Sequence, residues 1–171
     1  MSQRSSRQIV VMGVSGTGKT VLGRALAEAL ECDFVEGDAH HPPANIAKMS
    51  AGHPLDDDDR RPWLEELGSN LGRYRANGVG VVLACSSLKR SYRDILRGDG
   101  PMDATCFVHI DLPFEVLEAR MKARDHFMPA SLLQSQFDTL EALQDDECAI
   151  IVNDDDPVAE LVDGVVVRLA D

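Results

Sequence analysis

Short apolar runs alternate along the chain with longer stretches in which apolar residues recur every three or four positions. The short runs are rich in β-branched residues or almost continuously apolar, as strands buried in a parallel sheet are. The predicted strands are Gln8–Met12, Asp33–Glu36, Val79–Cys85, Thr105–Asp111 and Cys148–Asn153. Because parallel strands are joined by right-handed helical crossovers, the pattern predicts an α/β fold: a parallel five-stranded sheet with helices on both faces.

The longer stretches have the spacing of amphipathic helices, and several begin with a proline suited to a first helical turn. The predicted helices are Lys19–Leu30, Pro62–Asn77, Leu88–Arg97, Pro113–Arg124 and Ser131–Leu143, with a last helix opening at Asp156–Pro157. No repeat, low-complexity tract or linker interrupts the alternation. We therefore expect residues 1–171 to form one domain.

The loop after the first strand has a complete phosphate-binding pattern, GxxxxGK[ST]. It consists of Gly13, Val14, Ser15, Gly16, Thr17, Gly18, Lys19 and Thr20, between a predicted strand and a predicted helix. Its glycines let backbone N–H groups turn toward phosphates, and the helix N-terminus adds partial positive charge. Lys19 is predicted to reach the β- and γ-phosphates of ATP, and Thr20 to bind Mg²⁺. The alternative, a glycine-rich turn that binds nothing, is disfavoured because every fixed position of the motif is present.

The loop after the second strand offers a carboxylate. Ligands of parallel sheets bind at the carboxyl ends of the strands, and Asp38 follows such an end. A phosphoryl acceptor needs a carboxylate to orient its hydroxyl and take its proton, so Asp38 is a candidate catalytic residue. A turn or helix-cap aspartate is the alternative reading.

Four consecutive aspartates follow at positions 56–59. Such a run is either a metal site or the solvated start of a helix, where the dipole favours negative charge. For Asp56 and Asp57 the helix start is the preferred interpretation.

Basic residues gather in two further places. Lys89, Arg93 and Arg97 are spaced to share one helix face, which is either an anion-binding surface or a solvated face. The segment from Arg120 to Pro129 is typical of a lid that covers phosphates in small kinases, with helix-end cations as the alternative. In a chain of net charge −12, such local concentrations are what an anionic substrate needs.

The composition excludes several other roles. The net charge of −12 argues against nucleic acid as a partner, because binding phosphate backbones needs a basic face. No apolar run approaches the roughly 18 residues of a membrane span, and Ile9–Met12 is too short for a signal peptide, so we expect a cytoplasmic protein. Four dispersed cysteines without a CxxC pair are expected to be reduced thiols rather than zinc ligands.

Four blocks of the sequence resemble the thermoresistant-type gluconokinase family, small P-loop kinases akin to shikimate kinase and adenylate kinase. The blocks are GVSGTGKT at 13–20, EGDAHHPPANIAKMSAGHPLDDDDRRPWL at 36–64, CSSLKRSYRDILR at 85–97 and HFMPASLLQSQFDTLE at 126–141. The resemblance implies transfer of phosphate from ATP to D-gluconate with Mg²⁺, and a homodimer. The residues alone lead only to a kinase of a small, anionic, hydroxyl-bearing substrate.

The resemblance also implies roles for individual residues. The catalytic candidates are Lys19, Asp38 and Arg124, with Arg120 added to the ATP site and a lid at about 122–131. The substrate-binding candidates are Asp38, His41, Lys48, Arg60, Lys89, Arg93 and His126, among which Lys89 and Arg93 are the first choices for the gluconate carboxylate. Only Asp125 separates Arg124 from His126, one residue fewer than the family pattern, so Lys122 and Arg124 are alternatives for the lid role.

Two rival functions remain open at this point. One is a kinase of another small acceptor, such as shikimate or a nucleoside monophosphate, against which the second block argues. The other is a nucleotide-dependent switch. A guanine-reading switch carries Asn-Lys-x-Asp after a late strand, whereas residues 153–156 read Asn-Asp-Asp-Asp.

Overall fold

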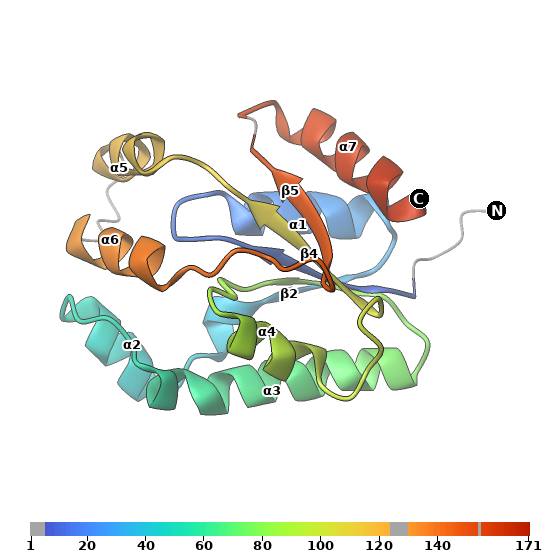
Figure 1. The fold of residues 1–171 in the computed structure, drawn as a ribbon, viewed down its shortest axis with the longest axis horizontal. Coiled ribbons are helices and arrows are strands. Elements are labelled where there is room, and N and C mark those ends of the chain that lie inside the picture. Colours follow the sequence, from blue (N-terminus) through green and yellow to red (C-terminus); the bar gives the residue numbers. More distant parts are fainter. Residues whose placement is uncertain (1–5, 124–129, 154) are drawn as a thin grey trace.

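A computed structural model describes residues 6–123, 130–153 and 155–171 (Figure 1). Its sheet has five strands in the order β2-β3-β1-β4-β5, and every pair of neighbours is parallel. The strands are β1 (Gln8–Met12), β2 (Asp33–Glu36), β3 (Val81–Ala84), β4 (Thr105–Ile110) and β5 (Cys148–Val152). The predicted α/β fold with a parallel five-stranded sheet is confirmed, and the bounds predicted for β1 and β2 coincide with the observed ones.

Helices cover both faces of the sheet, as predicted. They are α1 (Lys19–Ala29), α2 (Pro43–Ser50), α3 (Asp57–Ala76), α4 (Arg90–Arg97), α5 (Phe114–Lys122), α6 (Ala130–Thr139) and α7 (Val158–Ala170), with a short 3-10 helix η1 (Gly37–His40). Figure 1 shows α1 and α7 on one face and α3 and α4 on the other. The helices α2, α5 and α6 gather at the end where the strands terminate (left in Figure 1), which is where ligands of such sheets bind.

The sequence placed the start of α3 too late, at Pro62. The helix begins at Asp57, and Asp56 is its N-cap: the Asp56 carboxylate accepts from the Asp59 N–H at 2.7 Å, and the Asp59 carboxylate accepts from the Asp56 N–H at 3.0 Å. This reciprocal capping satisfies two helix-end donors, so the aspartate run begins a helix, as interpreted for Asp56 and Asp57.

The central strands form the core. Every residue of β1, β3 and β4 is buried, and the apolar side chains of α1, α3 and α4 pack against them. Burial on both faces explains the continuous apolar runs from which the strands were predicted. Among the described residues, no helix combines the length and apolar composition needed to span a membrane.

Candidate active site

Three parallel strands end at the same level beside the phosphate loop. In the register, Val11 of β1 and Glu36 of β2 both lie opposite Ala84 of β3. The strand β3 therefore stands between β1 and β2, and the loops that follow all three strands meet at one edge of the sheet. The adjacent loops are joined directly, since the Gly13 N–H donates to the Ser86 carbonyl at 3.2 Å.

Two glycines permit this close approach. Gly13 has φ +145°, and a Cβ there would lie 2.8 Å from the Ile110 carbonyl oxygen. A Cβ on Gly37 would lie 2.4 Å from the Ala84 carbonyl oxygen. Any side chain at either position would push the P-loop or η1 away from the strand ends, so glycine is needed at both.

Lys19 points from the start of α1 back into the P-loop. Its ammonium group donates to the Val14 carbonyl at 3.0 Å and is partly buried. Burial lowers the pKa of Lys19 below its ordinary value, while the nearby charges of Asp38 and Glu36 oppose that shift. A desolvated cation bordered by carboxylates is well placed to meet the charge of a triphosphate.

Thr20, the predicted Mg²⁺ ligand, donates its hydroxyl to the carboxylate of Glu36. The same carboxylate accepts from the Asp38 N–H at 3.4 Å and caps η1. Glu36 thus links the P-loop threonine to the segment that carries Asp38. Sequence reasoning missed this residue; its only signal is that it ends the strand before Asp38.

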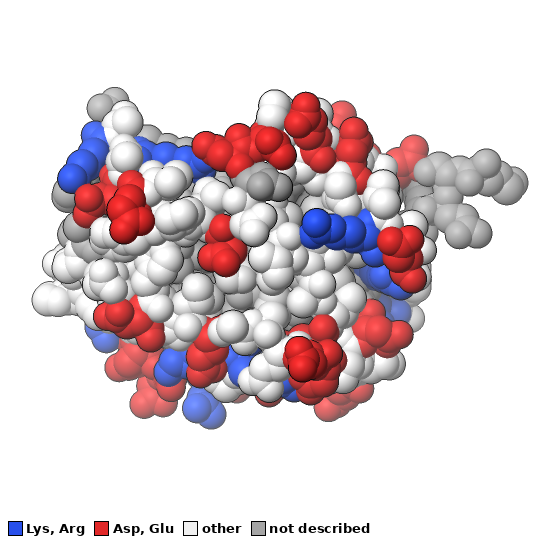
Figure 2. Space-filling model, turned by 45° about the horizontal axis from the view of Figure 1, so that its top comes forward, with Lys and Arg blue, Asp and Glu red and all other residues white. Residues whose placement is uncertain are grey.

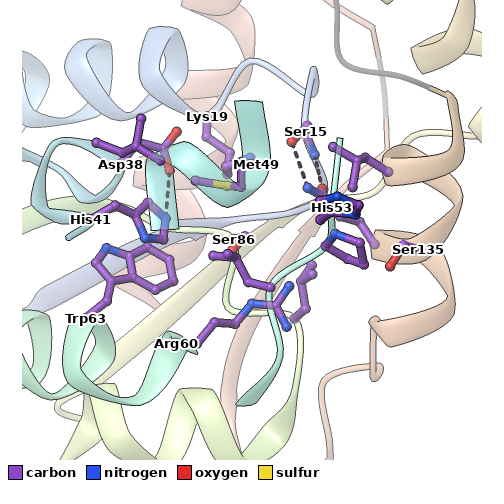
Figure 3. Close-up of a pocket in the computed structure, with 16 residues that line it drawn as sticks. Ser15, Lys19, Asp38, His41, Met49, His53, Arg60, Trp63, Ser86 and Ser135 are labelled. Atoms are coloured by element: carbon purple, nitrogen blue, oxygen red, sulfur yellow. Dashed lines mark hydrogen bonds and ion pairs between the residues drawn. The ribbon is translucent and has the colours of Figure 1, made fainter. Parts of the chain in front are cut away.

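A cavity of about 290 Å³ opens beside these residues (Figure 3). Its walls come from the P-loop, η1, α2, α3, the loop after β3, and α6. This volume lies near the lower end of the range for small-molecule sites, roughly 300–1,000 Å³. Of the predicted site residues, Ser15, Lys19, Asp38, His41 and Arg60 line it. His53, Ser86, Ser135 and Gln136 also line it and were not predicted.

Asp38 and His41 face each other at one side of the cavity. The closest oxygen of Asp38 lies 3.9 Å from Nε2 of His41, and the carboxylate is largely exposed, whereas the imidazole is 5% exposed. The His41 ring stacks on Trp63, with centroids 3.9 Å apart and planes inclined by 20°. The indole N–H of Trp63 donates to the Gly37 carbonyl at 2.8 Å, so the stack is anchored to η1. Asp38 is therefore accessible to a ligand, and His41 is packed in place.

Arg60 lies across the cavity from Lys19 and Asp38 in Figure 3. Its guanidinium donates to the Tyr92 hydroxyl at 2.9 Å and lies over that ring, 5.4 Å from its centroid. Within the described part of the chain it forms no ion pair with a carboxylate. A partly buried cation with free donors that faces a cavity is suited to an anionic ligand.

The other basic residues predicted to bind the substrate lie elsewhere. Lys48 pairs with Asp59 at 2.6 Å, and Lys89 pairs with Asp57 at 3.0 Å; both pairs lie outside the cavity wall. Each lysine thus neutralises an aspartate at the start of α3. The prediction that Lys89 is a first choice for the gluconate carboxylate is not supported by this position.

Arg93 is wrongly assigned to the substrate, because it is fully buried in an ion pair. Its guanidinium donates to both carboxylate oxygens of Glu147, at 2.8 and 3.1 Å. Its remaining donors reach backbone carbonyls, those of Ser87, Leu88, Glu141 and Ala142. All five donors of an arginine are then occupied, and none is left for a ligand. Arg97 is buried beside it and donates to Glu147 at 2.9 Å, so the basic face of α4 packs inward.

The predicted lid segment lies only in part within the described residues. Arg124 and His126 lie outside the described residues, as does most of the predicted lid at 122–131. Arg120, assigned to ATP, pairs with Asp155 after β5 and does not line the cavity. Lys122 is exposed and pairs with Glu118 at 3.3 Å.

Helix α6 reaches the P-loop through Gln136. Its side-chain oxygen accepts from the Ser15 N–H at 2.7 Å, and its side-chain nitrogen donates to the Ser15 hydroxyl at 3.0 Å. The edge-to-face contact of Phe114 with Phe137, at 5.6 Å, joins α5 to α6. Helix α6 is thereby fixed to the phosphate loop at one point and to α5 at another.

The molecule as a whole is acidic, with a net charge of −12. On the face in Figure 2, red Asp and Glu side chains are spread widely, with only small blue groups of Lys and Arg between them. An anionic ligand is therefore drawn in by local cations at the cavity and not by the overall field.

Comparison with known proteins identifies the family. A family model described as an AAA domain matches residues 9–130. A gluconokinase of Gluconobacter oxydans (strain 621H) is 54% identical over 149 residues, which cover 86% of this chain and 82% of that protein. The chain belongs to the gluconokinase family.

Two further members agree with this assignment. The thermosensitive gluconokinase of Escherichia coli (strain K12) is 46% identical, over 86% of this chain and 78% of the relative. The crystal structure of a gluconokinase from Sinorhizobium meliloti 1021 superposes with a TM-score of 0.87 at 48% identity, covering 98% of this chain and 94% of the other. The resemblance to gluconokinases seen in four sequence blocks is confirmed over most of the chain.

Proposed function

We propose that this protein transfers the γ-phosphoryl group of ATP to the terminal primary hydroxyl of D-gluconate and forms 6-phospho-D-gluconate. The observation that carries the proposal is the lining of one cavity: the P-loop lysine and an exposed carboxylate on one side, and on the opposite side an arginine that pairs with no carboxylate of the described residues. Gluconokinases at 46–54% identity support D-gluconate as the acceptor.

Each of the three charges has a separate task. Lys19 stabilises the β- and γ-phosphate oxygens, and the N–H groups of the P-loop hold the phosphates. Asp38 orients the acceptor hydroxyl and takes up its proton as the new bond forms. Arg60, on the opposite wall, binds the gluconate carboxylate and so directs the far end of the substrate, its primary hydroxyl, toward Asp38.

The residues present suit a Mg²⁺ ion. Mg²⁺ prefers oxygen ligands and is commonly held by one or two protein groups together with phosphates, not by an all-protein cage. The Thr20 hydroxyl is such a group, and the Glu36 carboxylate orients it. Among the described residues, no cluster of three His, Cys, Asp or Glu side chains could form an all-protein metal site. When bound beside Thr20, the ion would offset the negative charge of the phosphates.

Further properties are part of the same proposal. We propose a homodimer and a phosphate-covering lid at about 122–131 on the family resemblance, and a single domain over residues 1–171 on the length and the uninterrupted alternation of strands and helices. A cytoplasmic location is consistent with four free thiols at Cys32, Cys85, Cys106 and Cys148. The roles of Arg124 and His126 in the lid also remain proposals.

An ADP-release assay with a panel of acceptors tests the function. D-gluconate, shikimate, adenosine monophosphate and no acceptor are compared at equal ATP and Mg²⁺ concentrations. We expect rapid ADP release with D-gluconate alone. Equal rates with and without every acceptor would refute the kinase proposal and favour a nucleotide-dependent switch, whereas a preference for shikimate would refute the choice of acceptor.

A further inference from the structure

Asn45 is a buried polar residue of α2 that the proposed mechanism does not use. It is 4% exposed, and its side-chain nitrogen Nδ2 donates to the backbone carbonyl of Asp59 at 2.9 Å. A carbonyl oxygen can only accept, so the NH₂ end of the Asn45 amide must face Asp59. The orientation of this amide is therefore determined by its partner.

The same NH₂ group lies 3.3 Å from Nδ1 of His41. A nitrogen that carries two hydrogens cannot accept, so Nδ1 of a neutral His41 must be the acceptor and carry no hydrogen. The ring hydrogen then resides on Nε2, the nitrogen that faces Asp38 across 3.9 Å. Stacking on Trp63 holds the plane of the ring, and the contact with Asn45 holds its Nδ1 edge.

We propose that Asn45 is a positioning residue that fixes His41 in its Nε2–H tautomer, so that His41 donates a hydrogen bond to the acceptor hydroxyl held by Asp38. The inference rests on the proposed phosphoryl transfer. A gap of 3.9 Å is too long for a direct hydrogen bond between His41 and Asp38, but a hydroxyl oxygen placed beside it can accept from Nε2–H while its own hydrogen goes to the carboxylate. The opposite tautomer would turn a lone pair toward the hydroxyl oxygen and the carboxylate.

The surroundings of His41 favour the neutral ring that this role needs. Burial lowers its pKa, the Asp38 charge opposes that shift, and the Arg60 charge adds to it. Asp38 faces the ring from η1 and Arg60 faces it from α3. The residue of α2 that contacts the ring, Asn45, is neutral. The imidazole is thus a neutral donor at neutral pH.

Nitrogen NMR of histidine-labelled protein tests the tautomer directly. Spectra of the free enzyme near pH 7.5 are compared for the wild type and for His41→Gln, which identifies the His41 signals by their loss. We expect Nδ1 to resonate as an unprotonated nitrogen and Nε2 as a protonated one. A protonated Nδ1, or averaged signals from both tautomers, would overturn the proposal. Because this spectrum needs no substrate, it separates failure of the tautomer from failure of the proposed reaction.

Asn45→Asp links the tautomer to turnover. An oxygen in place of Nδ2 accepts from Nδ1–H, so the variant should reverse the tautomer or protonate the ring. We expect kcat with D-gluconate to fall roughly 10- to 100-fold, the range found for residues that orient metal-bound histidines, with KM for ATP nearly unchanged. The acid limb of the pH profile should move to higher pH.

Asn77→Asp is the matched control. Asn77 likewise donates Nδ2 to a backbone carbonyl, that of Arg73 at 3.0 Å, but it lies exposed at the end of α3. The Asn77→Asp substitution should leave the nitrogen spectrum of His41 and kcat unchanged. If Asn45→Asp keeps wild-type kcat while its spectrum shows the reversed tautomer, the functional part of the proposal is wrong. If Asn45→Asp does not fold, the wild-type spectrum still decides the structural part.

Discussion

Asp38 and Arg60 are proposed to act on opposite ends of the substrate, and each role can be tested by one substitution. Both charges face the cavity, but they differ in their surroundings. Asp38 is largely exposed and close to the P-loop lysine, whereas Arg60 is partly buried against Tyr92. Loss of the first should affect the chemical step, and loss of the second should affect binding.

Asp38→Asn keeps the size of the side chain and removes its basic oxygen. We expect kcat to fall by roughly 10² or more, in line with general-base contributions, since the proposed base for the acceptor proton is lost. ATP affinity, measured by calorimetry without acceptor, should change little. A kcat within a few-fold of wild type together with lost ATP binding would make Asp38 a structural or metal-binding residue.

Arg60→Gln removes the cation proposed to read the carboxylate. Hydrogen bonds to charged groups contribute about 1.5–3 kcal/mol, so kcat/KM for D-gluconate should fall about 10- to 100-fold, mainly through KM. We expect glucose, which has no carboxylate, to react much more slowly, and this reaction should hardly change in the variant. Lys48→Gln is the control, because Lys48 pairs with Asp59 outside the cavity and should leave kcat/KM within a few-fold of wild type. Equal losses in both variants would refute the assignment of Arg60.

Residue roles could be predicted from sequence where position in the fold determines them. The P-loop and Asp38 follow strand ends, so their place was evident from the strand pattern alone. The error at Arg93 has a different cause. Spacing shows that Lys89 and Arg93 share a helix face but not whether that face turns inward. The partner of Arg93, Glu147, lies 54 positions away and gives no local signal.

At the scale of elements, the buried pair of Arg93 with Glu147 ties α4 to the segment between α6 and β5. Glu147 is itself buried and also accepts from the Gln144 N–H at 2.8 Å. This segment also holds α4 through Glu141, whose carboxylate accepts from the Arg90 N–H at 2.9 Å. The segment between α6 and β5 is therefore held against α4 by a buried ion pair.

Arg93→Met should therefore reduce stability and not substrate affinity. It leaves the buried Glu147 carboxylate without its main partner, which in comparable cases costs about 3–5 kcal/mol of unfolding free energy. KM for D-gluconate in the folded fraction should stay near wild type. Urea unfolding measures the unfolding free energy, and steady-state kinetics measure KM for D-gluconate. Arg90→Gln, which breaks a surface pair with Asp146, should reduce stability far less. A stable Arg93→Met protein with a greatly raised KM would restore the sequence-based assignment.

The elements that sequence reasoning missed lack an apolar stripe. Helix α2 has eight residues, and its only buried one is Asn45, so hydrophobic periodicity could not indicate it. The prolines at 42 and 43 were the available signal, since proline favours a first helical turn. The strands were predictable because they are buried on both faces and read as continuous apolar runs.

At the scale of the whole molecule, the pH dependence of stability should follow its buried titratable groups. Burial lowers the pKa of His41 and of His109. As pH falls below about 6.5, the unfolded chain binds protons that these folded histidines do not, so stability declines. Burial opposes ionisation of Glu147, but hydrogen bonds from Arg93 and from the Gln144 backbone hold its pKa below the ordinary value. The stability that ionised Glu147 contributes is fully present above the pKa of about 4.3 that this group has in the unfolded chain. It is lost as pH falls through the lower pKa of the folded state.

Thermal unfolding midpoints between pH 8 and pH 4 check this profile. We expect a plateau above about pH 7, a gradual decrease toward pH 5 and a steeper decrease below about pH 4.5. His109→Gln should flatten part of the gradual decrease. A midpoint that stays constant from pH 7 to pH 5 would contradict the account of the buried histidines.

The central claim is that one cavity moves a phosphoryl group from ATP to the primary hydroxyl of D-gluconate. Phosphorus NMR of a reaction with ATP, Mg²⁺ and D-gluconate tests it most directly, because the coupling pattern identifies the acceptor atom. The account predicts that the γ-phosphate signal is replaced by a phosphomonoester signal split into a triplet by the two hydrogens of the terminal carbon. A doublet, which marks a secondary hydroxyl, or inorganic phosphate as the sole product would contradict it.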